Sequence, residues 1–224
     1  MKNKIKVLML IIILTSATFL LSGCQNKEEN NISNKNSTEN SESIRNSLMG
    51  QINSATSTTN TKLEDLETYN KETDENYTTC TLENGTSFMY PKDWISVGTE
   101  TEPAFMGTDG RGASVNIAKD SLNDDSSSTV DFATYMEFQK IYLKQQMTLL
   151  TDITEKNVNL NGKKAYIFNY VTETEQNETT IQLNVTQVAF EQEGEIEILT
   201  LAVINDFYND LQPTFEKMIK SFTK

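Results

Sequence analysis

Four long runs rich in β-branched and aromatic residues occupy residues 153–204, and only short turns separate them. Short turns favour antiparallel neighbours, because a parallel pair needs a crossover of about a dozen residues or more. Residues 164–171 are apolar on both alternating phases, and residues 196–204 are similar. Strands of this kind are covered on both faces. The sheet should therefore lie between two layers. The predicted strands are 153–160, 163–173, 179–191 and 195–204, with turns at 161–162, 174–178 and 192–194.

Two predicted helices supply that cover. The first should be capped by Ser128 or Thr129, with Asp131 in its first turn, and should run to about Leu150. The second should begin near residues 205–206 and re-form after Pro213. The apolar stripes of both helices indicate core packing: Phe132, Met136, Leu143, Met147 and Leu150 in the first, and Phe215, Met218, Ile219 and Phe222 in the second. The fold class is therefore α+β, an antiparallel sheet with helices on both faces.

Shorter strands precede the first helix. Residues 78–82 and 86–90 flank Asn84-Gly85, which predicts a hairpin. Pro91 ends that hairpin, and residues 95–99 and 103–107 are weaker strand candidates. Three glycines then mark a turn before a strand at 113–118, namely Gly107, Gly110 and Gly112.

The run 179–191 changes phase along its length. Ile181, Leu183 and Val185 are apolar on odd positions, whereas Val188 and Phe190 are apolar on even ones. Either a bulge lies near Thr186-Gln187 or both faces are buried there, since a one-residue slip moves every side chain to the other face. We predict the bulge.

The N-terminus has the pattern of an export signal. Three lysines within residues 2–6 precede an apolar run that ends at Leu21-Ser22-Gly23-Cys24. This step resembles the lipobox of bacterial lipoproteins. A transmembrane anchor and an ordinary secretory signal are the alternatives, but the run is short for a span. The resemblance implies removal of residues 1–23, diacylation of Cys24, and attachment to the bilayer on the extracytoplasmic face of the cell membrane.

Residues 24–76 form a predicted flexible tether, because polar residues dominate and large apolar residues are sparse. Ile44, Leu48 and Ile52, and likewise Leu63, Leu66 and Tyr69, have spacings that could give short helical turns. As a coil the tether would span roughly 40 Å. Residues 77–224 then form one globular domain, large enough to bury a core without help.

The composition excludes several function classes. The chain has no histidine and a net charge of −13, which excludes Ser-His-Asp and Cys-His catalysis and argues against nucleic acid as a partner. Of 19 basic residues, three lie in residues 1–23, so 16 would remain against 32 acidic ones. With Cys24 acylated, Cys80 has no partner, and we expect it to be buried and structural. We predict no cofactor and no catalytic or metal site.

One acidic loop offers oxygen ligands for calcium, at Asp120, Asn123, Asp124 and Asp125. It lacks the alternating ligands and central glycine of an EF-hand. A solvated loop is the favoured interpretation.

Three motifs, in order, resemble the PsbP-like family: Phe88–Trp94 with its Tyr-Pro-x-x-Trp step, Leu160–Tyr166, and Phe215–Phe222. The resemblance implies an antiparallel sheet sandwiched by helices and a binding or assembly role rather than catalysis. It carries over no ligand-binding residue. Tyr90, Pro91 and Trp94 should turn the chain and cap the core. We therefore expect a non-catalytic module that binds an envelope protein or a wall component. A small-ligand or metal-binding accessory lipoprotein is the alternative, and an enzyme is third.

Overall fold

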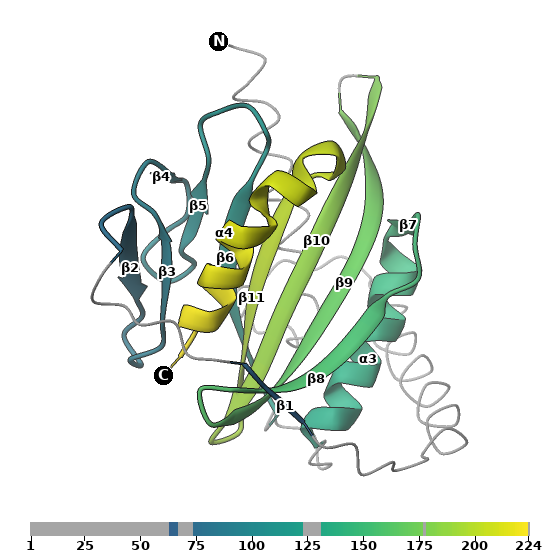
Figure 1. Ribbon diagram of the computed structural model, residues 1–224. Helices are drawn as coiled ribbons and strands as arrows, with labels where there is room; N and C mark the ends of the chain where they lie inside the picture. Colours follow the sequence, from purple (N-terminus) through teal and green to yellow (C-terminus); the bar gives the residue numbers. More distant parts are fainter. Residues whose placement is uncertain (1–62, 67–73, 123–130, 177, 224) are drawn as a thin grey trace, which may run out of the picture.

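The computed structural model describes residues 63–66, 74–122, 131–176 and 178–223. These residues form a nine-stranded sheet, a separate two-stranded hairpin and two α-helices (Figure 1). The strands are β1 (Glu64–Leu66), β2 (Tyr77–Thr81), β3 (Ser87–Pro91), β4 (Ile95–Ser96), β5 (Ala104–Met106), β6 (Ser114–Ser121), β7 (Thr148–Leu149), β8 (Thr154–Leu160), β9 (Lys163–Gln176), β10 (Thr179–Gln192) and β11 (Glu195–Ile204). The helices are α3 (Phe132–Gln146), the 3₁₀ turn η2 (Asn205–Phe207) and α4 (Tyr208–Ser221).

The predicted run of four antiparallel strands is confirmed. The sheet order is β1-β8-β9-β10-β11-β6-β5-β4, and β7 pairs with β9. Asn161 and Gly162 both have positive φ, 52° and 83°, as a two-residue hairpin requires. Glu193 and Gly194 repeat that pattern at the β10–β11 turn. β9 continues to Gln176, so the turn predicted over 174–178 is shorter than expected.

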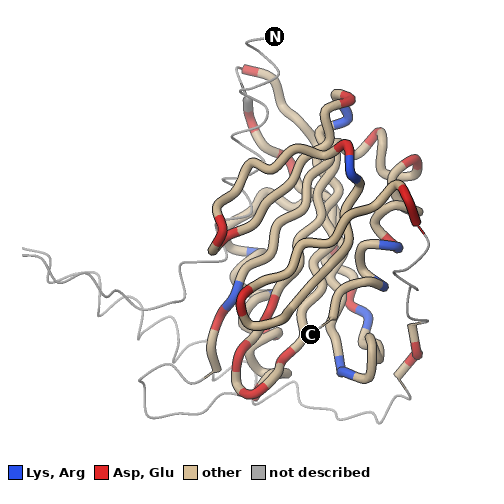
Figure 2. Tube along the Cα trace, turned by 90° about the vertical axis from the view of Figure 1, so that its left-hand side faces the viewer, with Lys and Arg blue, Asp and Glu red and all other residues tan. Residues whose placement is uncertain are grey.

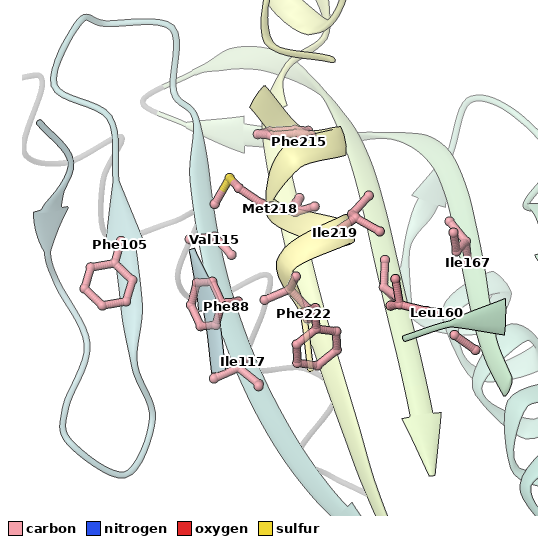
Figure 3. Packing of buried hydrophobic residues seen from close by; sticks show 14 of the residues in the cluster. Phe88, Phe105, Val115, Ile117, Leu160, Ile167, Phe215, Met218, Ile219 and Phe222 are labelled. Carbon is pink, nitrogen blue, oxygen red and sulfur yellow. The ribbon is translucent and has the colours of Figure 1, made fainter. Parts of the chain in front are cut away.

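Alternate side chains of the central strands enter two separate hydrophobic clusters. On β10, Val188 and Phe190 belong to the cluster that contains the buried side chains of α4, here called the α4 cluster. Leu183, Val185 and Ala189 belong to the cluster that contains those of α3, the α3 cluster. Figure 3 shows Met218 of α4 and Phe222, directly after the helix, packed with residues from the strands. The core is mostly β-sheet.

The bulge predicted in β10 is wrong. Thr186 and Gln187 pair in an unbroken register with Leu201 and Thr200 on one side and with Asn169 and Phe168 on the other. Both Thr186 and Gln187 are buried. The apolar phase changes because residues 185–190 of β10 are buried on both faces of the sheet. This was the alternative interpretation.

The predicted ends of α3 are also wrong. Its N-cap is Asp131, whose Oδ1 accepts the Thr134 N–H at 2.8 Å. Ser128 and Thr129 lie outside the described residues. The helix ends at Gln146, because Thr148 and Leu149 pair with β9 instead. Leu150, predicted as core, is 41% exposed.

The second helix does not stop at Pro213. α4 runs through this residue from Tyr208 to Ser221. Pro213 cannot donate to the carbonyl of Asn209. Both residues are exposed, so water can satisfy that carbonyl.

The N-terminal half of the fold contains one strand that sequence reasoning missed. β1 pairs in parallel with β8, and Leu66 packs against the α4 cluster. The prediction of short helical turns with Leu63 and Leu66 is therefore wrong at this point, and three residues of the predicted tether belong to the sheet. The predicted hairpin is confirmed as β2 and β3, although it pairs apart from the main sheet.

Candidate functional site

A polar pocket of about 450 Å³ lies where β1, the β8–β9 turn and the C-terminal end of α4 meet. Figure 1 shows β1 beside β8 at the lower end of the sheet. The volume falls within the range of about 300–1,000 Å³ that small-ligand sites occupy, but such sites are predominantly apolar. No aromatic residue lines this pocket, whose lining is Asp65, Leu66, Asn159, Asn161, Gly162, Lys220, Ser221 and Thr223.

The turn and the end of α4 hold the pocket walls in place. The Asn161 amide nitrogen donates to the carbonyls of Lys220 at 3.2 Å and Phe222 at 2.8 Å. Thr223 exchanges two backbone hydrogen bonds with Ser87 of β3. The bond to Lys220 satisfies a carbonyl that the last turn of α4 leaves without an intrahelical donor. The Asn-Gly turn thus both closes a hairpin and caps α4.

β1 supplies the acidic wall of the pocket. Glu64 forms an ion pair with Lys156 at 2.6 Å, and Asp65 accepts from the Asn159 amide at 2.7 Å. Within the described residues, Lys220 forms no ion pair. The pocket therefore combines carboxylate, amide and ammonium groups, an arrangement suited to polar contacts with peptide-like groups.

A buried carboxylate, missed by sequence reasoning, ties the β2–β3 hairpin to the sheet. Glu197 is 2% exposed, and its Oε1 accepts from Asn84 Nδ2 at 2.5 Å and Thr86 Oγ1 at 2.6 Å. Its Oε2 has no hydrogen-bond partner among the described residues. The sequence does contain a signal for this buried site. Glu197 alternates with Leu199 and Leu201 on β11, and both leucines are in the core.

The acidic loop considered for calcium binding is described only in part. Asp120 accepts the Tyr135 hydroxyl at 2.7 Å, and Gln139 donates to that hydroxyl at 2.7 Å. Burial, and then the charge of Asp120, raises the pKa of Tyr135, which keeps this phenol protonated. Asn123, Asp124 and Asp125 lie outside the described residues. Asp120 therefore fixes the start of α3 to the sheet.

Tyr90 and Trp94 of the Tyr-Pro-x-x-Trp step pack with the α4 cluster, where Trp94 is buried and Tyr90 is half-buried. The rings of Tyr90 and Phe105 stack with centroids 3.7 Å apart. Trp94 is 8% exposed, and a Cβ at Gly107 would lie 3.3 Å from its Nε1. Pro91 is the last residue of β3.

Cys80 is less buried than predicted. It is half-buried, and it forms no disulfide with the described residues. Burial raises the pKa of its thiol, so the reactive thiolate is disfavoured. Cys80 packs against the α4 cluster. Its role in this environment is packing.

The predicted lipid attachment site lies outside the described residues, as do Leu21, Ser22 and Gly23 beside Cys24. No helix in the described part of the chain is both long and apolar enough to cross a membrane. Across the same residues, no cluster of three or more cysteine, aspartate and glutamate side chains is placed to hold a metal ion.

Residues 75–224, 150 of the 224 residues, match the PsbP family. The chain belongs to the PsbP family. The match begins beside β2, the first strand of the predicted domain, and includes all three motifs singled out in the sequence. No curated protein matches the chain.

Several solved structures are similar to this PsbP-family chain. Cyanobacterial PsbP (CyanoP) from Synechocystis is 15% identical over 70% of this chain and 98% of its own, with a TM-score of 0.47. A protein of unknown function, PA94 from Pseudomonas aeruginosa, is 19% identical over 66% and 97%, with a TM-score of 0.46. LpqN of Mycobacterium tuberculosis, described as involved in cell envelope biogenesis, is 13% identical over 68% and 86%, with a TM-score of 0.44.

Proposed function

We propose that the chain is a membrane-anchored extracytoplasmic lipoprotein whose PsbP domain is a non-catalytic binding or scaffold module of the cell envelope. The family match over residues 75–224 is the observation that carries the module role. The Leu-Ser-Gly-Cys step at 21–24 supports the anchor, with acyl chains on Cys24 in the bilayer. In this proposal α3 and α4 cover opposite faces of the sheet, and the domain presents its surface to an envelope protein or wall component.

The described surface supports a polar contact. Ile95 and Leu150 are the exposed large apolar side chains among the described residues, whereas apolar docking sites are contiguous patches. Figure 2 shows acidic residues at many strand ends and loops. A partner held by such a surface is recognised by charge and hydrogen bonds, and its binding should weaken as salt rises.

The pocket beside β1 favours one alternative, a small-ligand accessory lipoprotein. Its volume is sufficient, but its lining has no tyrosine or phenylalanine. A pocket of this composition can hold a polar group, and it lacks the apolar walls that bury most of a small ligand. The binding-module proposal therefore remains the better supported of the two.

Three experiments test the proposal. Mass spectrometry of the membrane fraction should find a mature N-terminus at a lipid-modified Cys24, and Cys24→Ala should abolish it. In-membrane crosslinking should capture a defined partner whose yield falls with salt. Turnover of a substrate by the purified chain, abolished by one side-chain change that spares the fold, would support an enzyme instead.

A further inference from the structure

The outer edge of β8 is only partly paired. Val158, Asn159 and Leu160 pair with β1, but no strand among the described residues pairs with the outer edge of residues 154–157. The side chains of 154–157 are exposed. An edge of this kind presents N–H and C=O groups that another extended segment can use.

β1 itself is a weakly held occupant of that edge. It has three residues and makes the one parallel pairing among the described strands, and parallel pairing is slightly less stable per residue than antiparallel pairing. Its ion pair joins Glu64 to Lys156, whose side chains are 60% and 50% exposed. Leu66 alone packs against the α4 cluster.

Two lysines lie beside β1 in a chain with a net charge of −13. Lys156 on β8 forms an ion pair with Glu64 of β1. Lys220 lines the pocket next to Leu66. These two cations therefore mark the corner of the sheet at which β1 lies. β1 brings two carboxylates, Glu64 and Asp65, to this corner.

We propose that the outer edge of β8 is a docking site for an acidic, extended segment of a partner protein, and that β1 occupies this site until the partner replaces it. This inference rests on the proposed binding role and names its surface. Backbone pairing with β8 provides affinity, and alternate side chains provide specificity. The segment places an acidic residue within reach of Lys156, as Glu64 does, and an apolar residue in the site of Leu66.

The pocket extends the recognition beyond the strand. Asp65 and Leu66, the last two residues of β1, line it together with Lys220. A segment that follows the path of β1 therefore delivers its next group to this pocket. A carboxylate there would pair with Lys220, and it can come from an acidic side chain or from a chain terminus.

The test is fluorescence anisotropy with the full chain in detergent and a labelled peptide that copies residues 60–69. Leu66→Asp should release β1 and strengthen peptide binding by about tenfold or more, because a tethered competitor acts at an effective concentration near millimolar. Glu64→Lys, an exposed change beside Lys156, tests the same release if Leu66→Asp fails to fold. In the Leu66→Asp chain, where β1 no longer competes, Lys156→Glu should weaken peptide binding about two- to fivefold, and a peptide with lysine at the Glu64 position should restore it. Lys144→Glu, on α3, is the matched control and should change nothing.

Tighter binding by the release variants together with charge-swap rescue supports the proposal. Equal binding by parent and release variants, or no rescue, overturns it. Two peptides that end after the apolar residue, one with a free carboxyl terminus and one amidated, test which group pairs with Lys220. Tighter binding of the free-carboxyl peptide indicates a terminal carboxylate, and equal binding of the two indicates an acidic side chain. Crosslinking separates this inference from the binding role: if the full chain captures a partner but the peptide binds neither the parent nor the release variants, the β8 edge alone is overturned.

Discussion

In the centre of the sheet, β9 and β10 each have 14 residues and β11 has ten, and β10 and β11 carry side chains into both hydrophobic clusters. At the outer edge, β1 has three residues, and two of them are exposed carboxylates. Apolar burial stabilises by about 25 cal/mol per Å², whereas exposed ion pairs contribute about 0–1 kcal/mol. The centre therefore determines whether the domain folds, and the edge can exchange its occupant without unfolding it.

Phe190→Ala should have the largest effect on stability. Phe190 is 1% exposed and lies 4.5 Å, between ring centroids, from Phe222. Removing such a side chain costs about 3–5 kcal/mol, because a cavity remains. Urea unfolding measures the change. Leu150→Ala, at an exposed position, is the control, and an equal loss in both variants would contradict a dominant centre.

Glu197→Ala should follow in size. Its carboxylate accepts hydrogen bonds from Asn84 and Thr86, and its removal leaves both groups without that partner. Such a loss costs about 1–3 kcal/mol. Glu195→Ala, at an exposed position of the same strand, is the control and should change stability by less than about 0.5 kcal/mol. A smaller loss for Glu197→Ala than for this control would show that the carboxylate does not hold the hairpin.

The central strands were predictable because their signals are local. Runs that are apolar on both alternating phases, joined by short turns at Asn161-Gly162 and Glu193-Gly194, allow few alternatives to an antiparallel ladder. The same local pattern misled at Thr186-Gln187, since sequence phase alone cannot separate a bulge from a strand buried on both sides.

The remaining features depend on tertiary contacts. β1 exists because Leu66 reaches the α4 cluster and Glu64 meets Lys156, about 90 residues along the chain. α3 stops at Gln146 because β9 offers pairing to Thr148 and Leu149. Of the candidate pocket, Asn161-Gly162 was visible as a turn, but its meeting with Lys220 was not.

Asp131→Ala should destabilise the domain by about 1 kcal/mol, the usual cost of losing an N-cap. Hydrogen bonds from the Thr134 backbone and side chain hold the pKa of Asp131 below its ordinary value. A lowered folded-state pKa gives stability that is present above the unfolded-state pKa of about 3.9 and is lost as pH falls through the folded-state pKa. The difference between parent and variant should therefore shrink in acid, as thermal unfolding at several pH values can measure. Asp131→Asn keeps the cap without titrating. A stability difference between parent and Asp131→Ala that grows as pH falls would be inconsistent with Asp131 as a charged N-cap.

Lys156→Ala should have the smallest effect on stability and the most informative one. Its ion pair with Glu64 is about half exposed on both sides, so water and salt screen it and the loss should be below about 0.5 kcal/mol. Urea unfolding of the full chain measures that loss, and Lys144→Ala on α3 is the control. A loss above about 2 kcal/mol would mean that β1 is part of the folding core, and the edge could then not exchange its occupant. A small loss, combined with weaker binding of an acidic peptide, would separate the edge from the centre in a single variant. Stability would then belong to β9–β11, and recognition to the outer edge of β8.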